Sequence, residues 1–316
     1  MNSSKSPGSL ALALAFFAIY FVWGTTYLAS IIGLQSMPPF VLSALRYLAA
    51  AVLLGTYVVV SKKFRLDRRS LVVLAISGCL MLVGGSGLVV YGEQYVNSGY
   101  AAVIVASEPL WFILLDKKRW RLYFGNPGIM IGLVTGFIGI VLFTMLSPAE
   151  AAVRPGGILT GTVILLISSV LWVVGALYAN KRLPPGGSTV SNTAVQLLSG
   201  GIASALLALI LGEWNNFHPA TVSLNAWLAL LFLVIFGSLI AYVAFNWLLT
   251  VRPPAIVSTH TYVNPVVAIA IGSAFFDEAV GGRQILALAV VLVAVIVTQV
   301  SKDRALSRVG SEAPAS

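Results

Sequence analysis

Two short strings place a polar side chain beside a proline in the middle of long apolar runs. They are Ser107-Glu108-Pro109-Leu110 and, about 155 residues later, Val263-Asn264-Pro265-Val266. A membrane helix tolerates an ionisable group and a helix breaker at mid-depth only where a neighbour or a water-filled cavity satisfies them. Their recurrence at matching positions of two halves is typical of an internally repeated transporter. The carboxyl of Glu108 and the amide of Asn264 are therefore candidate substrate-binding groups.

Arg46 and Glu108 are expected to lie at similar depths in the bilayer. Each stands about eight to ten residues from the outer end of its helix, and 1.5 Å per residue places both roughly 12–15 Å deep. One hypothesis makes Glu108 a proton-linked or cation-binding group in a cavity, where desolvation favours the neutral carboxyl. The other makes the two residues a fixed pair between helices. We expect Glu108 to line the cavity and to contact Arg46 in at least one conformation.

Aromatic residues form a second candidate feature. Trp23 and Tyr27 share one face of the first helix, and Trp172 holds the corresponding place in the second half. An aromatic face stacks aromatic substrates or binds cations, and the alternative is packing between helices. We favour the cavity for Trp23 and Trp172, because Gly24 and Gly175 beside them permit close approach of a ligand or a neighbouring helix.

His260 and Asn264 lie four residues apart, on one face of the ninth helix. A histidine can titrate near neutral pH, although a hydrogen-bonded structural histidine is the alternative. Asn264 is expected to face the cavity, because Pro265 frees a backbone carbonyl that needs a partner. The complete set of predicted substrate-binding residues is Trp23, Tyr27, Arg46, Tyr91, Glu108, Trp111, Trp172, Tyr242, His260 and Asn264.

The composition identifies the environment in which these residues act. Of 316 residues, 59% are hydrophobic and only 9% charged, and the mean hydropathy is +0.96. A soluble domain carries roughly a quarter charged residues, so the chain is a polytopic membrane protein. Its net charge of +9 comes from short tracts between apolar runs, which fits membrane topology and not nucleic-acid binding. With Cys79 as the single cysteine, we expect no disulfide, metal site or cofactor.

The apolar runs predict an all-α membrane protein with ten transmembrane helices. A span needs about 20 apolar residues. The ten runs are 10–33, 38–61, 70–92, 98–115, 127–146, 157–180, 189–211, 224–249, 255–276 and 281–300. The polar segment before the first run has no cleavage signature, so we interpret that run as a helix and not as a removed signal.

The basic residues predict the orientation of these helices. Two of the 19 Lys and Arg residues, Arg154 and Arg283, fall on one side, and Arg46 falls within a span. The other sixteen fall on the side of the N-terminus: Lys5, Lys62, Lys63, Arg65, Arg68, Arg69, Lys117, Lys118, Arg119, Arg121, Lys181, Arg182, Arg252, Lys302, Arg304 and Arg308. Because cytoplasmic loops carry an excess of basic residues, both termini are expected in the cytoplasm.

The ten runs divide into two halves of five, in residues 1–150 and 151–316. An odd number of helices in each half forces the second to enter the membrane the opposite way. This predicts two inverted-topology repeats with the substrate site near the midplane between them. Gly128, Gly132 and Gly136 form a double GxxxG face on the fifth helix. Because such a face also packs helices within one chain, we favour a monomer over a dimer.

Ordered strings in both halves carry a further signal. They are Phe21-Val22-Trp23-Gly24-Thr25-Thr26-Tyr27, Ala44-Leu45-Arg46-Tyr47, Glu93-Gln94-Tyr95-Val96-Asn97-Ser98-Gly99, Glu108-Pro109-Leu110-Trp111, Gly237-Ser238-Leu239-Ile240-Ala241-Tyr242 and Tyr262-Val263-Asn264-Pro265-Val266. Each string alone is weak. Together they resemble the EamA family of the drug/metabolite transporter superfamily across essentially the full length.

The resemblance implies a ten-helix bacterial inner-membrane permease, often an exporter, with exporters of aromatic amino acids among its members. It also implies a central cavity lined mainly by helices 1, 3, 4, 6, 8 and 9. The chain departs from the family where Asp116-Lys117-Lys118-Arg119-Trp120 interrupts the fourth helix early. The two halves are therefore expected to differ on their cytoplasmic side.

These observations favour a secondary transporter that exports small organic metabolites by alternating access. Amino acids, aromatic ones among them, and drug-like compounds are the expected cargo. A nucleotide-sugar or sugar-phosphate carrier is the first alternative, but it would need several cavity Lys or Arg residues, and only Arg46 is embedded. An intramembrane enzyme acting on lipid is the second. We find no H-E-x-x-H, G-x-S-x-G or P-loop string, so no enzymatic activity is expected.

Overall fold

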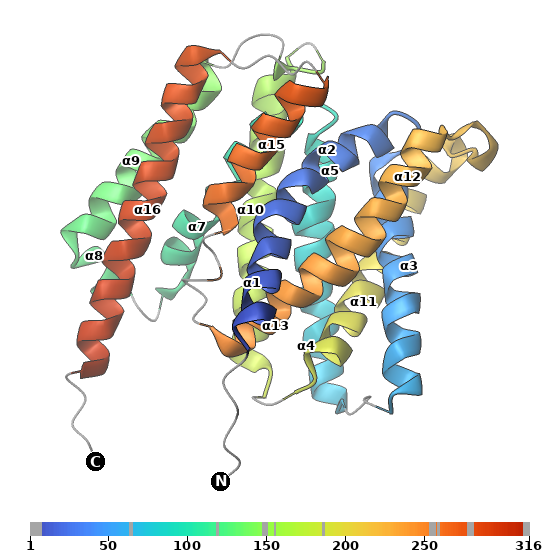
Figure 1. Cartoon of the computed structure of the whole chain (residues 1–316), viewed down its shortest axis with the longest axis horizontal. Coiled ribbons are helices and arrows are strands. Elements are labelled where there is room, and N and C mark those ends of the chain that lie inside the picture. Colours follow the sequence, from blue (N-terminus) through green and yellow to red (C-terminus); the bar gives the residue numbers. More distant parts are fainter. Residues whose placement is uncertain are drawn as a thin grey trace.

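The computed structural model shows a bundle of long helices (Figure 1). It describes residues 8–62, 66–117, 120–146, 151–154, 156–184, 187–252, 257, 260–276 and 281–311. Within these ranges there is no β-strand, and a single antiparallel bridge joins Val96 to Ala152. The start of α1 and the end of α16 lie at the same end of the bundle (Figure 1).

The helical elements follow the predicted apolar runs. In chain order they are α1 (Ser9–Phe17), η1 (Ala18–Val22), α2 (Trp23–Leu34), α3 (Pro39–Val60), α4 (Arg68–Gly78), η2 (Cys79–Gly87), α5 (Leu88–Gly92), α6 (Ser98–Val105), α7 (Glu108–Leu115), α8 (Trp120–Phe124), α9 (Pro127–Leu146), α10 (Gly157–Arg182), α11 (Thr189–Ile210), η5 (Glu213–Asn216), η6 (Pro219–Thr221), α12 (Leu224–Phe232), η7 (Leu233–Tyr242), α13 (Val243–Val251), α15 (His260–Phe276) and α16 (Gly282–Ser311).

Eight helical segments are long and apolar enough to cross a membrane. They are Ser9–Leu34, Pro39–Val60, Arg68–Gly92, Ser98–Leu115, Pro127–Leu146, Gly157–Arg182, Thr189–Ile210 and Leu224–Val251. Two shorter apolar helices, Val263–Phe275 and Ile285–Thr298, fall at the predicted ninth and tenth runs. The expected start of the ninth run, in 255–256 and 258–259, lies outside the described residues. The chain is thus all-helical in its described part, and the count of ten remains a prediction.

Residue types at the helix ends explain where several helices begin. Asn97 accepts a hydrogen bond from the backbone N–H of Tyr100 at 2.9 Å and so caps α6. Ser223 caps α12 in the same way. Pro39 occupies the first turn of α3, where its missing N–H costs no intrahelical bond. The short fourth helix expected from the sequence is confirmed, since α7 ends at Leu115.

Three of the long helical segments contain a π-helical stretch. These stretches are η1 in the first segment, η2 in the third and η7 in the eighth. A π-helix widens the turn by one residue and is frequent at functional sites. The sixth segment, α10, is an uninterrupted α-helix instead.

The glycine face of α9 packs inside the chain, because α16 lies against it (Figure 1). A Cβ atom added at Gly132 would approach the Ala294 carbonyl oxygen to 2.8 Å. One added at Gly139 would lie 2.9 Å from a methyl group of Val291. Small residues therefore allow close contact between α9 and α16. The preference for a monomer stays a prediction.

Candidate functional site

A buried cavity lies where the first, third, fourth, sixth, eighth and ninth helices predicted from the sequence meet, with side chains of α3 and α11 joining its wall. The room inside it for water-sized spheres totals about 90 Å³. Both η2 and η7 contribute wall residues, among them Gly85, Ser86, Gly237 and Ser238. Two of the three π-helical stretches thus border one cavity.

Eight of the ten residues predicted to bind substrate lie on this wall. They are Trp23, Tyr27, Arg46, Glu108, Trp172, Tyr242, His260 and Asn264. The structure therefore brings together side chains that are up to 241 positions apart in the sequence.

The other two predicted residues, Tyr91 and Trp111, lie away from the cavity wall. The Tyr91 ring stacks on Phe40, with 5.6 Å between ring centroids. The indole N–H of Trp111 donates to the Ser107 hydroxyl at 3.1 Å, and its ring meets Phe137 edge-on at 5.2 Å. Both side chains pack against neighbouring groups and are not among the lining residues, and their binding of a substrate stays a prediction.

Aromatic rings make up one end of the cavity wall. Trp23 meets Trp172 edge-on with 5.9 Å between centroids, and it lies 5.2 Å from both Phe245 and His260. The Trp23 indole N–H donates to the Gly237 carbonyl at 3.1 Å, which fixes the ring against η7. Trp172 lies 6.2 Å from Tyr242. These edge-to-face and tilted contacts are favourable aromatic geometries, and they hold the rings rigidly.

Arg46 reaches the cavity beside this aromatic cluster. Its Nε donates to the Ser238 hydroxyl at 2.8 Å, and its guanidinium carbon lies 5.2 Å from the centroid of the Tyr47 ring. Within the described part of the chain no ion pair joins Arg46 to Glu108. The hypothesis of a fixed Arg46–Glu108 pair is therefore wrong for this structure. The Nε of Arg46 instead donates its hydrogen bond to the hydroxyl of Ser238, which belongs to the other half of the chain.

Glu108 stands at a break in the fourth helix. The chain leaves α6 after Val105 and begins α7 at Glu108, with Pro109 in the first turn of the new helix. The side chain is only 7% exposed. Yet none of the described residues donates a hydrogen bond to its carboxyl group or forms a salt bridge with it. Tyr27 lies within electrostatic range of this carboxyl. Glu108 thus presents an uncompensated acidic group to the cavity.

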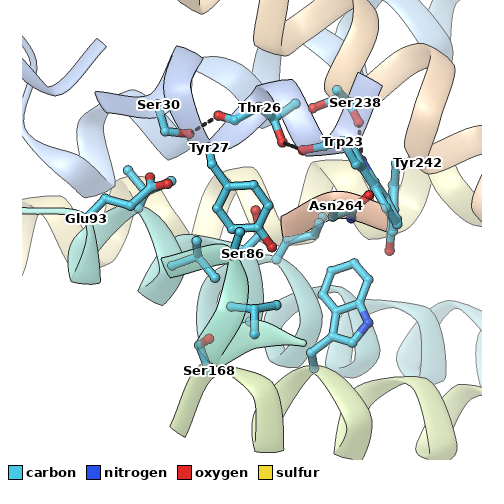
Figure 2. A pocket seen from close by; sticks show the side chains of 18 of the residues that line it. Trp23, Thr26, Tyr27, Ser30, Ser86, Glu93, Ser168, Ser238, Tyr242 and Asn264 are labelled. Atoms are coloured by element: carbon cyan, nitrogen blue, oxygen red, sulfur yellow. Dashed lines mark hydrogen bonds between the residues drawn. The ribbon is translucent and has the colours of Figure 1, made fainter. Parts of the chain in front are cut away.

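Glu93 is a second acidic residue on the wall, and it was not predicted. Although Glu93 is near the end of the third helix, its side chain is only 2% exposed and borders the cavity. Figure 2 shows Glu93 on one side, Tyr27 extending across the middle, and Trp23 with Tyr242 on the other side. Tyr27 is within electrostatic range of Glu93 as well as of Glu108. The cavity wall therefore combines two acidic side chains with a cluster of aromatic rings.

Asn264 lies on the cavity wall, but its amide group forms hydrogen bonds with backbone carbonyls. With the amide nitrogen turned toward the first helix, it donates to the carbonyl oxygens of Tyr20 at 2.8 Å, Ile19 at 3.0 Å and His260 at 3.1 Å. Two of these carbonyls belong to η1. The His260 Nδ1 lies 2.9 Å from the Val257 carbonyl, the hydrogen-bonded arrangement considered as the alternative for this histidine.

Small hydroxyl residues complete the wall and were missed by the sequence analysis. They are Thr26, Ser30, Ser86, Ser168, Ser238 and Thr261. Several follow or flank glycine in apolar segments, as in Gly85-Ser86 and Gly237-Ser238, and this pairing is a usable signal. Elsewhere in the described ranges, no group of three His, Cys, Asp or Glu side chains could hold a metal ion.

Comparison with known proteins shows extensive similarity. A sequence model described as the EamA-like transporter family matches residues 10–145 and 159–300. The uncharacterized inner membrane transporter YedA of Escherichia coli (strain K12) is 32% identical over 298 residues, covering 93% of this chain and 92% of YedA. Protein PecM of Dickeya dadantii (strain 3937) is 27% identical over 284 residues, covering 88% of this chain and 89% of PecM.

A solved crystal structure has the same fold. It superposes with a TM-score of 0.64 at 19% sequence identity, and the match covers 94% of this chain and 98% of the other. The similarity extends over nearly the whole length of both chains and therefore concerns the complete helical bundle.

Proposed function

Because the chain belongs to the EamA-like transporter family, we propose that it exports small organic metabolites across the bacterial inner membrane by alternating access. Amino acids, aromatic ones among them, or drug-like compounds are the proposed cargo. The observation that carries this proposal is the cavity inside the bundle, whose wall combines aromatic and acidic side chains.

The packing of the helices supports two inverted repeats of five, in residues 1–150 and 151–316. If the halves are related by a twofold axis, the second and seventh helices form a self-equivalent pair, and so do the fifth and tenth. The structure has both contacts, as α3 packs on α11 and α9 on α16. The third and sixth helices meet through η2 and α10, and the equivalent eighth and first meet through α12 and α2.

The proposed orientation places both termini in the cytoplasm. It is supported by the basic residues, sixteen of which fall on one side, and by the common end at which α1 starts and α16 finishes (Figure 1). Single cysteines introduced at Ser4, Asn216 and Ser311 in a Cys79→Ser background test it. A membrane-impermeant maleimide added to intact cells should label Asn216→Cys alone, and labelling of Ser4→Cys would overturn the topology.

A carrier for nucleotide sugars or sugar phosphates is the weaker alternative. Phosphate groups are bound by several Lys or Arg side chains or by helix N-termini. Arg46 is the one basic side chain of Lys or Arg type among the lining residues, which include the two acids Glu93 and Glu108. An anionic polyphosphate would therefore meet one cationic side chain and two acidic ones, which disfavours this cargo. The second alternative, an intramembrane enzyme that acts on lipid, is disfavoured because relatives of this chain are named transporters.

A ligand screen of the purified full chain tests the function. Thermal-shift measurements against amino acids, aromatic amines and drug-like cations should find ligands that stabilise the protein. Proteoliposomes that contain the protein should then exchange these ligands across their membrane in a counter-transport assay. Trp23→Ala and Trp172→Ala should each weaken binding by about 1–2 kcal/mol, because each removes an aromatic contact. Trp120→Ala is the matched control, since Trp120 is 39% exposed and away from the cavity. Absence of any transported compound would overturn the proposal.

A further inference from the structure

Two buried polar residues hold the same place in the two halves of the chain. Counted from Pro39 and from Thr189, Arg46 is the eighth residue of α3 and Gln196 is the eighth residue of α11, and both helices have 22 residues. The two side chains are 6% and 4% exposed, respectively. The proposed inverted repeat makes these two helices, the second and the seventh, equivalent. Arg46 and Gln196 are therefore candidates for equivalent roles.

Each of these side chains donates a hydrogen bond to a serine of another helix. Nε of Arg46 donates to the Ser238 hydroxyl at 2.8 Å. Nε2 of Gln196 donates to the Ser77 hydroxyl at 3.0 Å. Ser238 belongs to the eighth helical segment and Ser77 to the third, which the proposed repeat also makes equivalent. The two hydrogen bonds are thus counterparts in the two halves.

Two contacts fix the register of α3 against α11. Val41 and Ala208 belong to one small core cluster. A Cβ atom added at Gly201 would lie 2.9 Å from the backbone nitrogen of Leu48. Between these contacts α3 advances by seven residues while α11 goes back by seven, so the two helices are antiparallel.

This register puts the two hydrogen bonds at different levels of the bundle. Gln196 is level with residue 53 of α3, which lies seven residues beyond Arg46, or about 10 Å along the axis. In the proposed orientation Arg46 is nearer the periplasmic end of its helix, and Gln196 is nearer the cytoplasmic end. We call the hydrogen bond of Arg46 with Ser238 the outer latch, and that of Gln196 with Ser77 the inner latch.

Both latches adjoin the cavity. Arg46 and Ser238 belong to its wall. Gln196 is not among the lining residues, but Leu197, which follows it, is one of them. Tyr242, also on the wall, donates its hydroxyl to Oε1 of Gln196 at 2.9 Å. The inner latch therefore lies directly behind the wall and is joined to it through one side chain.

The inner latch has more hydrogen-bond partners than the outer latch. Oε1 of Gln196 accepts from the Asn246 side-chain amide at 3.3 Å, in addition to the Tyr242 hydroxyl. Among the residues that the structure describes, Ser238 is the single hydrogen-bond partner of the Arg46 side chain. The helices are consequently joined more firmly at the level of the inner latch.

We propose that the two latches control access to the cavity, so that the inner latch breaks when the cavity opens to the cytoplasm and the outer latch breaks when it opens to the periplasm. This inference rests on the proposed function and deepens it by naming the residues that keep each side closed. Access from one side requires the helices at that end to separate, and a hydrogen bond between them is then lost. Ser238 lies in η7 and Ser77 lies two residues before η2, where a π-helical turn lets the helix bend.

Access of a reagent to a cysteine in the cavity tests the inference. Ser86 lines the cavity, so Ser86→Cys in the Cys79→Ser background provides the reporter. Right-side-out and inside-out membrane vesicles of the full chain are treated with a membrane-impermeant maleimide, with no substrate added. The ratio of the cytoplasmic to the periplasmic labelling rate then measures the balance between the two open states.

The two latches should shift this ratio in opposite directions. Ser77→Ala should raise it by about fivefold and Ser238→Ala should lower it by about fivefold, as expected for the loss of one buried hydrogen bond. Gln196→Met removes every hydrogen bond of the inner latch and should raise the ratio by about tenfold or more. The double variant Ser77→Ala/Ser238→Ala should return the ratio close to that of the reporter alone.

Ser43→Ala and Ser204→Ala are the matched controls. These serines are buried in α3 and α11, and their hydroxyls have no hydrogen-bond partner among the described residues. Each control should leave the ratio unchanged within about twofold. Melting temperatures are measured in parallel, because a purely structural role would lower them in Ser77→Ala and Ser238→Ala without moving the ratio. That result would overturn the latches.

The outcomes separate this inference from the transport function. Shifts in the same direction for Ser77→Ala and Ser238→Ala, or shifts no larger than those of the controls, would overturn the latches. The transport function would then stand on the compounds that the ligand screen finds to be transported. A reporter that is labelled from one face only, in every variant, would instead contradict alternating access and with it the proposed function.

Discussion

The two regions built around Glu108-Pro109 and Asn264-Pro265 have similar sequences but different structures. In the first, the helix breaks, so that Pro109 lies in the opening turn of α7 and no intrahelical hydrogen bond is lost. In the second, α15 runs from His260 to Phe276 with Pro265 inside it. Pro109 thus lies at a break between two helices, whereas Pro265 lies inside a continuous helix.

The polar side chains before the two prolines differ in the same way. The Asn264 amide is committed to three backbone carbonyls, two of which lie in the π-helical stretch of the first helix. The Glu108 carboxyl has no hydrogen-bond donor among the described residues and faces the cavity. The comparison indicates that Asn264 joins two helices, whereas Glu108 remains available to a ligand. Two similar strings can therefore have different roles: one stabilises the packing of helices, and the other leaves a polar group open to a ligand.

Gly24→Ala should have the largest effect on the structural side of this comparison. A Cβ atom at Gly24 would approach Cβ of Val267 to 2.7 Å and the Asn264 carbonyl oxygen to 3.3 Å. The backbone contact leaves little room to adjust, so we expect a loss of about 2–3 kcal/mol in the free energy of unfolding. Gly55→Ala is the control, because a Cβ atom there meets nothing within 4 Å. Thermal unfolding in detergent measures both, and equal melting temperatures would contradict close packing of α2 on α15.

Asn264→Leu should destabilise the protein less, by about 1–2 kcal/mol. The substitution leaves the carbonyls of Ile19 and Tyr20 without their side-chain donor. Asn264→Gln keeps the amide group but lengthens the side chain, and it should recover part of the loss. Circular dichroism melting curves at matched detergent concentration check the order. An Asn264→Leu variant as stable as the wild type would mean that the amide does not join the helices.

Glu108→Gln should leave the melting temperature unchanged or raise it slightly, within about 0.5 kcal/mol in unfolding free energy. The reason is that no described residue donates to the Glu108 carboxyl, so removing its charge breaks no contact within the protein. The same melting curves used for Asn264→Leu provide the comparison. If Glu108→Gln were as destabilising as Asn264→Leu, both polar residues would be structural and the division between them would be wrong.

The positions of the helices and much of the cavity wall could be predicted from the sequence. Apolar runs and capping residues locate the helices, and the unusual residues Trp23, Trp172 and Glu108 stand out against an apolar background. Depth along a helix also follows from residue counting, which is why Arg46 and Glu108 do share a cavity. The hydrogen bond from Arg46 to Ser238, in contrast, is revealed by no local pattern of the sequence.

The rotation of the third helix could not be predicted, and this explains why the cavity wall contains Glu93 and not Tyr91. Its π-helical stretch, η2, ends at Gly87, just before both residues. One additional residue in a turn rotates the following face by about 100°. A projection that assumes a regular α-helix therefore assigns the wrong side chains to the cavity. In the structure Glu93 lines it and Tyr91 stacks on Phe40.

The smallest expected effect concerns a carboxyl outside the membrane-spanning segments, and it provides a reference for Glu108. Glu213 accepts hydrogen bonds from the backbone N–H groups of Phe40 at 2.8 Å and Val41 at 3.0 Å, at the start of α3. Burial raises the pKa of Glu213 above its ordinary value, although these two N–H groups act in the opposite direction. The folded state therefore holds this proton more tightly than the unfolded state. As pH rises from the ordinary carboxyl value toward the raised one, the free energy of unfolding falls.

Glu213→Gln should remove this part of the pH dependence, because glutamine accepts the same backbone hydrogen bonds without ionising. We expect a change in melting temperature below about 2 °C, visible as a flatter profile as pH rises above the ordinary carboxyl pKa. Asp67→Asn is the control with the opposite sign. Hydrogen bonding from Ser70 lowers the pKa of Asp67, so its contribution is lost as pH falls through that lowered value. If Glu213→Gln instead steepened the profile in this range, the acidic residue would stabilise the folded chain in its charged form, and burial would not be the dominant influence on its pKa.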